Sequence, residues 1–137
     1  MVYLAWVIMT AFFYVLSLVF KGKGTFNRTL EFVGYGYLPQ LIGAAIGAVL
    51  IYQFATTATV TPISDMTAIQ DAINALMKDP LIQLSTFVSA VFLVWSANIW
   101  IFGLKYARSL TTKSAALTVG LPVALYLAYM LYTAVVA

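Results

Sequence analysis

The sequence predicts an all-α integral membrane protein with four transmembrane helices and one short amphipathic helix at the membrane interface. Hydrophobic residues make up 64% of the 137 residues and charged residues only 8%, whereas a soluble domain carries about 25% charged residues. Four stretches carry no charge, and each has the roughly 20 residues that a helix needs to cross a bilayer. All charged residues lie between these stretches.

The first predicted span, residues 1–20, has no basic segment before it and is followed by Lys21 rather than by a small-residue cleavage site. It is therefore not a signal peptide. Either the chain begins at the outer face, or an upstream segment such as a further helix precedes it. The remaining spans are expected at about 32–55, 81–104 and 114–137, and residues 1–137 form a single helical-bundle domain.

The amphipathic helix is expected at about 65–78, where apolar residues recur at helical spacing and polar residues take the opposite side. Ser64 is a candidate N-cap and Pro80 a candidate stop. At about 14 residues the helix is too short to span, so it should lie on the outer surface. It either covers the bundle or offers a lipid or partner site. Its apolar positions are Met66, Ile69, Ile73, Leu76 and Met77.

The basic residues predict the orientation. Six of the seven lie in the first and third loops, and Lys78 alone lies in the middle loop. By the positive-inside rule, the first and third loops are cytoplasmic and residues 56–80 lie on the outer face of the membrane. The same side chains suit lipid phosphates or an acidic partner protein. The six residues are Lys21, Lys23, Arg28, Lys105, Arg108 and Lys113.

Two features inside the spans indicate helix packing. Gly36, Gly43 and Gly47 form a small-residue face, which permits close contact within the chain or between two copies. Asn98 needs a hydrogen-bond partner inside the membrane, and Gln40 lies at a similar predicted depth. The alternative is that Asn98 and Gln40 line a path for a small solute.

The absent residue types exclude most chemistry. The chain has no Cys and no His, so it cannot supply a thiolate, a Ser-His-Asp triad, a haem imidazole or a Cys/His zinc site. The four carboxylates lie outside the spans, which leaves no intramembrane proton relay. We therefore expect no enzyme, no catalytic residue, no metal site and no cofactor. We also expect no nucleic-acid binding, because the basic residues lie beside membrane spans.

Two segments resemble the Yip1-domain membrane proteins. The first is Gly22-Lys23-Gly24-Thr25-Phe26-Asn27-Arg28-Thr29-Leu30 followed by Val33-Gly34-Tyr35-Gly36-Tyr37-Leu38-Pro39. The second runs from Trp95 through Gly103-Leu104-Lys105 to Ser109-Leu110-Thr111-Thr112-Lys113-Ser114-Ala115-Ala116 and Pro122. The family has about five helices and a cytoplasmic amino-terminal region. A missing first helix would account for the four spans seen here.

The resemblance implies a non-catalytic membrane scaffold or adaptor that binds membrane or peripheral proteins. Eukaryotic relatives are associated with Rab-type GTPases, so a small GTPase is a partner by family analogy only. Membrane lipids and other membrane proteins are the general partners expected. Two alternatives stay open, since function must be argued from a site. The first alternative is an accessory subunit of a larger membrane complex, and the second is a small channel or transporter.

Overall fold

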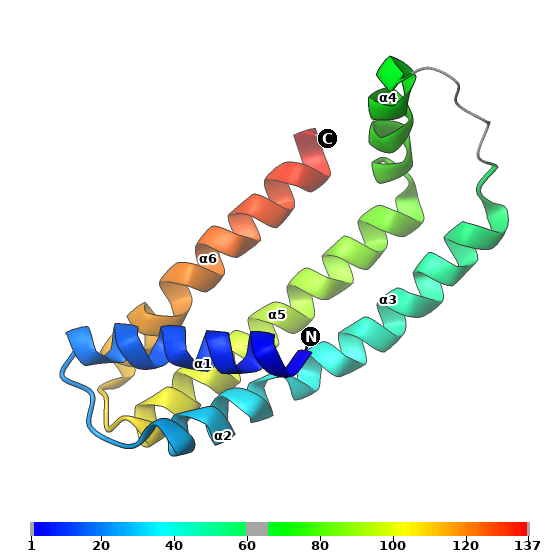
Figure 1. Ribbon diagram of the computed structural model, residues 1–137. Helices are drawn as coiled ribbons and strands as arrows, with labels where there is room; N and C mark the ends of the chain where they lie inside the picture. The colour runs from blue at the N-terminus through cyan, green and yellow to red at the C-terminus, as the bar shows by residue number, and fades with distance from the viewer. Residues whose placement is uncertain (1, 60–65, 137) are drawn as a thin grey trace.

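The computed structural model describes residues 2–59 and 66–136, and every element within these ranges is helical (Figure 1). The element at the centre is α5, which packs against α2, α3 and α6, while α1 packs against α2 and α6. The helices are α1 (Val2–Val19), α2 (Phe26–Gly36), α3 (Leu38–Thr57), α4 (Met66–Met77), α5 (Pro80–Ala107) and α6 (Thr112–Val136).

The predicted fold class is confirmed. Three segments are long and apolar enough to cross a membrane, namely Phe26–Thr57, Pro80–Ala107 and Thr112–Ala134. The helix Tyr3–Val19 is a shorter apolar one. In Figure 1, α3, α5 and α6 run side by side, and α1 crosses the end of the bundle where it meets α2 and α6.

The second span begins earlier than its predicted start near residue 32. Thr25 caps α2, because its hydroxyl accepts a hydrogen bond from the Arg28 amide at 3.4 Å. This is the usual role of a threonine before the first helical residue. The first loop therefore shrinks to Phe20–Thr25, and Arg28 lies on the first turn of a helix rather than in a loop.

The amphipathic helix ends at Met77, before the predicted stop Pro80, and Pro80 is also the first residue of α5. The Asp79 carboxylate caps this helix by accepting a hydrogen bond from the Leu81 amide at 2.8 Å. Proline suits the first helical position, where its missing N–H would have no partner in any case. The helix then continues to Ala107, beyond the predicted end at 104.

The amphipathic helix is present as α4. Its apolar side chains Ile69 and Ile73 are 42% and 46% exposed, so the bundle does not cover this face. Among the described helices, α5 is the one with which α4 makes substantial contact. The predicted cap Ser64 and the predicted first residue Asp65 lie outside the described residues.

The second span is broken at Tyr37, and tryptophan side chains bind the backbone beside the break. The Tyr37 amide donates to the Gly34 carbonyl at 3.0 Å, which releases the Val33 carbonyl from its usual partner. The Trp100 indole N–H donates to that Val33 oxygen at 2.8 Å. On another side of α2, the Trp6 indole donates to the Leu30 carbonyl at 3.0 Å. A membrane helix tolerates a break when other groups satisfy its backbone in this way.

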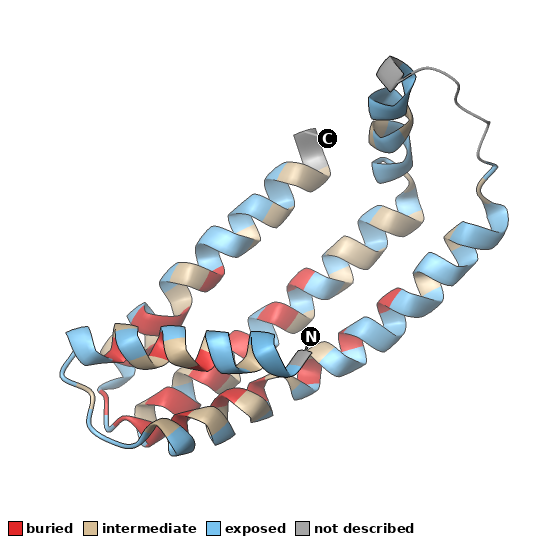
Figure 2. Ribbon diagram, viewed as in Figure 1, coloured by how far each residue is buried: buried red, intermediate tan, exposed pale blue. Residues whose placement is uncertain are grey.

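The core lies at the end of the bundle nearest the short loops, where buried residues gather in Figure 2. Trp100 is 1% exposed, and the rings of Phe13 and Tyr37 pack edge-on against it with centroids 5.5 and 5.4 Å away. Such aromatic contacts stabilise beyond the area that they bury. Toward the opposite end, α3, α5 and α6 expose most of their surface (Figure 2).

Gly36 is required by this core. A Cβ atom on Gly36 would lie 2.0 Å from the Trp100 indole nitrogen, and Trp100 cannot move without breaking its hydrogen bond to Val33. We predict that Gly36→Ala lowers the free energy of unfolding in detergent by about 1–3 kcal/mol, as overpacking does in other cores.

The matched control is Gly120→Ala, since a Cβ at Gly120 on α6 would meet nothing within 4 Å. This substitution should be neutral or slightly stabilising, because alanine favours a helix more than glycine does. Equal losses for the two variants would show that the contact with Trp100 is not what requires glycine at position 36.

Candidate functional site

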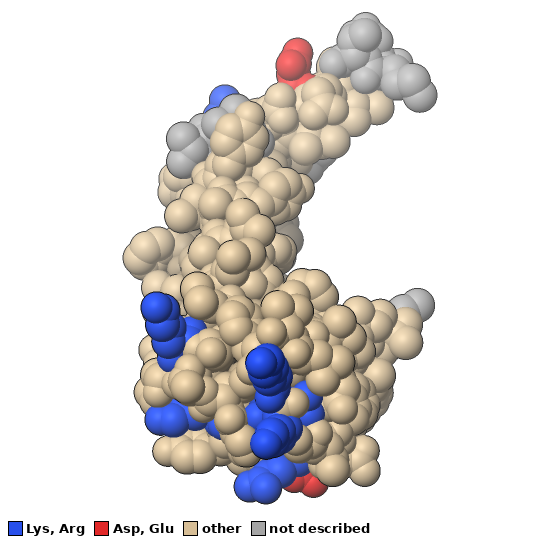
Figure 3. Space-filling view, turned by 90° about the vertical axis from the view of Figure 1, so that its left-hand side faces the viewer, with Lys and Arg blue, Asp and Glu red and all other residues tan. Residues whose placement is uncertain are grey.

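The basic side chains gather at one end of the bundle, around the two short loops. In Figure 3, most Lys and Arg side chains gather over the lower part of the face turned toward the viewer. Lys21, Lys23 and Arg28 are exposed beside the first loop, and Lys113 is exposed at the start of α6. Lys105 is half-buried at the end of α5, with its ammonium 5.5 Å from the centre of the Tyr106 ring.

Arg108 differs from the other five basic residues that the sequence analysis grouped as a docking surface. It is 1% exposed. Its Nε donates to the Ser17 hydroxyl at 2.8 Å, and its Nη2 donates to the Gly22 carbonyl at 2.9 Å. Its Nη1 donates to the Gly24 carbonyl. Each guanidinium nitrogen donates a hydrogen bond within the chain and the side chain is buried, so Arg108 is not part of an exposed docking surface.

An aromatic ring completes the surroundings of this guanidinium. The Arg108 Cζ lies 4.0 Å from the centre of the Tyr14 ring, which is the geometry of a cation–π contact. Ser17, which accepts from Arg108, donates its own hydroxyl to the Tyr14 carbonyl at 2.6 Å. None of these contacts is with a carboxylate. Carbonyl and hydroxyl dipoles and the Tyr14 ring stabilise the positive charge. Arginine suits these surroundings better than lysine, because its planar guanidinium can donate several hydrogen bonds and stack on a ring at the same time.

The backbones of the two loops also touch directly. The Lys23 amide donates to the Arg108 carbonyl at 2.8 Å. Gly24 adopts φ +129°, and a Cβ there would lie 2.2 Å from the Ala107 carbonyl oxygen. Only glycine therefore fits at this position. Together with the Arg108 side chain, these contacts join the first and third loops into one surface.

Sequence reasoning placed Arg108 with the exposed cations because loop arginines beside a membrane normally face water. The structure shows the residues that bury it, namely a serine on the last turn of α1 and two loop glycines. The pattern Gly22-Lys23-Gly24 was visible in the sequence, but nothing in it indicated that its carbonyls face an arginine 84 and 86 residues away.

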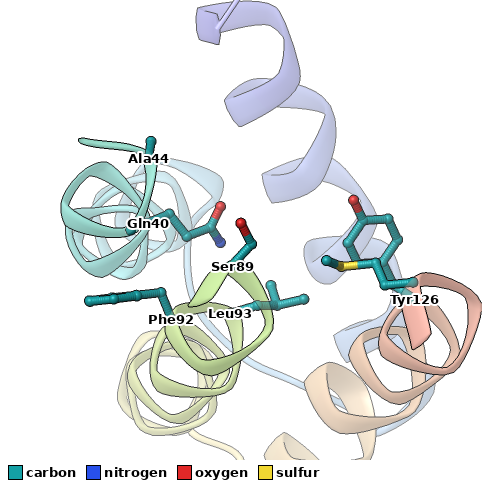
Figure 4. A pocket seen from close by; sticks show the side chains of 8 residues that line it. Gln40, Ala44, Ser89, Phe92, Leu93 and Tyr126 are labelled. Carbon is teal, nitrogen blue, oxygen red and sulfur yellow. The ribbon is translucent and has the colours of Figure 1, made fainter. Parts of the chain in front are cut away.

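The predicted partners Asn98 and Gln40 are not brought together. Asn98 is exposed in a groove between α2 and α5. Gln40 is half-buried and points into a cavity of about 210 Å³ between α3, α5 and α6. Figure 4 shows the Gln40 amide and the Ser89 hydroxyl directed into this space, with Tyr126 on the opposite side.

The glycine face lies where the sequence predicted close packing, and the contact is within the chain. A Cβ on Gly43 would lie 2.9 Å from the Phe92 side chain, and one on Gly47 would lie 3.2 Å from the Ser85 hydroxyl. With the Gly36–Trp100 contact, these positions fix α2 and α3 antiparallel to α5. The small residues allow the backbones to approach, as they do in other membrane proteins.

Within residues 2–59 and 66–136, no group of three metal-ligating side chains lies close enough together to hold a metal ion. The cavity beside Gln40 adjoins another of about 230 Å³, lined by Pro122 and Val123 of α6 and by Trp100. Gln40 lines both. The arrangement offers hydrogen bonds and apolar surface inside the membrane and cationic side chains at its edge.

Comparison with known proteins adds a family. A family model described as the Yip1 domain matches residues 1–133. An uncharacterized protein of the archaeon Methanocaldococcus jannaschii is 46% identical over 48 residues. That match spans 35% of this chain and 34% of the relative, so the chain is aligned with about a third of the relative's length. No solved structure matches.

The loop contacts predict a stability role for Arg108. Arg108→Gln should lower the free energy of unfolding in detergent by about 3 kcal/mol, because hydrogen bonds to a charged donor are lost and buried carbonyls are left unpaired. Arg108→Lys should recover only part of this loss, since an ammonium cannot reproduce the planar fork. Arg28→Gln removes the same charge from an exposed position and should change the stability little. Equal effects of the two glutamine variants would contradict this role.

Proposed function

The chain belongs to the Yip1 domain family, and from this premise we propose that it is a non-catalytic membrane scaffold that binds other proteins at the basic end of its bundle. The observation that carries the proposal is the joining of the two loops by Arg108, which holds exposed cations on one surface. This docking surface consists of Lys21, Lys23, Arg28, Lys105 and Lys113.

A joined surface favours docking because little ordering is needed when a partner binds. Two separate loops would lose conformational freedom on association, and that loss weakens binding. Exposed cations of one sign also accelerate the approach of an acidic partner and disfavour basic ones. The partner that this chemistry suits is therefore a protein with an acidic surface. A small GTPase remains a candidate by family analogy.

The same charges support an orientation. With Arg108 included, six basic residues lie at the loop end and Lys78 lies beside α4 at the other. The positive-inside rule places the docking surface in the cytoplasm and α4 on the outer face. A cytoplasmic docking surface is what a scaffold for peripheral proteins requires.

The cavity at Gln40 favours a second function, that of an accessory subunit in a larger membrane complex. Gln40 carries both donors and an acceptor, and it lies beyond the break in the second span, more than two helical turns from the Arg28 level. Polar side chains at such depth serve as hydrogen-bonding contacts between membrane helices. Asn98 does not pair with Gln40, so in this second function a transmembrane helix of a neighbouring subunit supplies the hydrogen-bond partner of Gln40.

The orientation predicts the labelling of single cysteines, which the cysteine-free chain makes possible. Asn27, Gln70 and Thr112 are exposed and are suitable positions. In intact cells an impermeant thiol reagent should label Gln70→Cys alone, and all three variants should react after the membrane is permeabilised. Labelling of Asn27→Cys from outside would refute the orientation.

The docking proposal predicts loss of partner binding when exposed lysines are neutralised. Changing Lys21, Lys23 and Lys113 to Gln should reduce the recovery of proteins that co-purify with the chain from native membranes by tenfold or more. Three basic residues would remain at this end against Lys78 at the other, so insertion should be preserved. Binding by the wild type should weaken at high salt, where exposed charges are screened.

Lys78→Gln provides the control, because it removes an exposed lysine from the opposite end. Its partner recovery should equal that of the wild type. If the triple variant retains its topology, its thermal stability and all of its partners, the basic residues serve orientation alone and the docking proposal fails.

A further inference from the structure

A groove of about 590 Å³ runs along the outside of the bundle between α2 and α5. Its walls are aromatic, and most of the rings are about half exposed or more. Because α2 and α5 belong to membrane-spanning segments, the groove opens toward lipid. The rings that line it are Phe32 and Tyr35 from α2 and Trp95, Phe102 and Tyr106 from α5.

Two cations lie just beyond the lining of this groove, at its end nearest the loops. Arg28 lies one helical turn before Phe32 and so projects from the same face of α2. Gly103 packs against Phe32, since an added Cβ would lie 3.0 Å from the Phe32 side chain. The antiparallel pairing therefore places Arg28 about level with Ala107, next to Tyr106. The Lys105 ammonium lies 5.5 Å from the centre of that Tyr106 ring. A negative group at the mouth of the groove would therefore meet both side chains.

Asn98 provides a polar group deeper in the groove. It lies seven residues before Lys105 on α5, which corresponds to about 10 Å along the helix. Its side chain is exposed in the groove, and among the residues that the structure describes no hydrogen bond engages its amide. Placing an unpaired amide in hydrocarbon costs free energy, so a partner that brings oxygen atoms to this depth is favoured.

We propose that this groove binds one anionic phospholipid from the bilayer. Arg28 and Lys105 bind the phosphate, and guanidinium groups suit phosphate through paired hydrogen bonds. The Asn98 amide donates to an oxygen that joins the glycerol to its chains, and one chain lies along the aromatic walls. Basic pockets between membrane helices bind anionic headgroups in this manner.

The occupant is a lipid rather than a protein for a structural reason. The cations, the amide and the aromatic walls form one continuous strip that runs from the membrane edge toward its centre, as a phospholipid does. The exposed lysines Lys21, Lys23 and Lys113 belong to the first loop and to α6, not to the two helices that form this groove. The lipid site shares Arg28 and Lys105 with the docking surface, and variants of Lys21, Lys23 and Lys113 distinguish protein docking from lipid binding.

The test is a titration of the full-length protein in neutral detergent micelles with dioleoyl phosphatidylglycerol or dioleoyl phosphatidylcholine, followed by native mass spectrometry. The wild type should retain one phosphatidylglycerol in preference to phosphatidylcholine. The double variant R28Q/K105Q should lose affinity for phosphatidylglycerol by about thirtyfold, because each basic residue near anionic lipid contributes about 1 kcal/mol. Asn98→Leu should weaken the binding of both lipids, since their glycerol oxygens are the same.

The matched control is K23Q/K113Q, which removes the same net charge from exposed positions outside the groove. It should retain phosphatidylglycerol like the wild type. An equal loss in the control would show general charge attraction, and equal retention of the two lipids by the wild type would show no headgroup recognition. Displacement of the lipid by inorganic phosphate would indicate a free-phosphate site. Each of these three results would overturn the proposal.

Discussion

The guanidinium of Arg108 is the interaction on which the loop end of this protein depends. It connects the end of α1, the first loop and the link between α5 and α6 through Ser17, Gly22 and Gly24. No carboxylate takes part in these contacts, and the Tyr14 ring covers the cation. A buried charge is stable only when its hydrogen-bonding capacity is met. Backbone carbonyls of the first loop accept hydrogen bonds from the guanidinium, and the same hydrogen bonds fix the position of that loop.

The bundle is tight at this end and open at the other. Near the loops, tryptophan side chains bind the backbone of α2, and glycines allow α5 to approach closely. Beyond the break at Tyr37, the helices expose most of their surface, and cavities surround Gln40. In lipid, exposed apolar side chains carry no penalty, because hydrocarbon surrounds them as well as protein would. The two proposed binding sites therefore lie at the tightly packed end, and the Gln40 cavity lies toward the open one.

The parts of the fold that depend on local sequence were predictable. The charge-free stretches identified the spans, and the alternation of apolar and polar residues identified α4. The start of the second span was predicted near residue 32 and lies at Phe26 after the Thr25 cap, because whether a polar residue caps a helix depends on backbone geometry. The predicted pairing of Asn98 with Gln40 was wrong for a different reason. Depth along a helix is readable from sequence, but the side of the helix that faces a neighbour depends on packing.

The burial of Arg108 was not predictable, since its contacts join residues more than 80 positions apart. It is also the most direct point at which to test the account. The Lys23 amide belongs to an exposed loop residue and yet donates to the Arg108 carbonyl at 2.8 Å. Hydrogen exchange of this amide, measured for the wild-type protein in lipid nanodiscs, should be as slow as exchange in the adjoining helix ends. Exchange at the rate of an unstructured peptide would contradict the joining of the two loops.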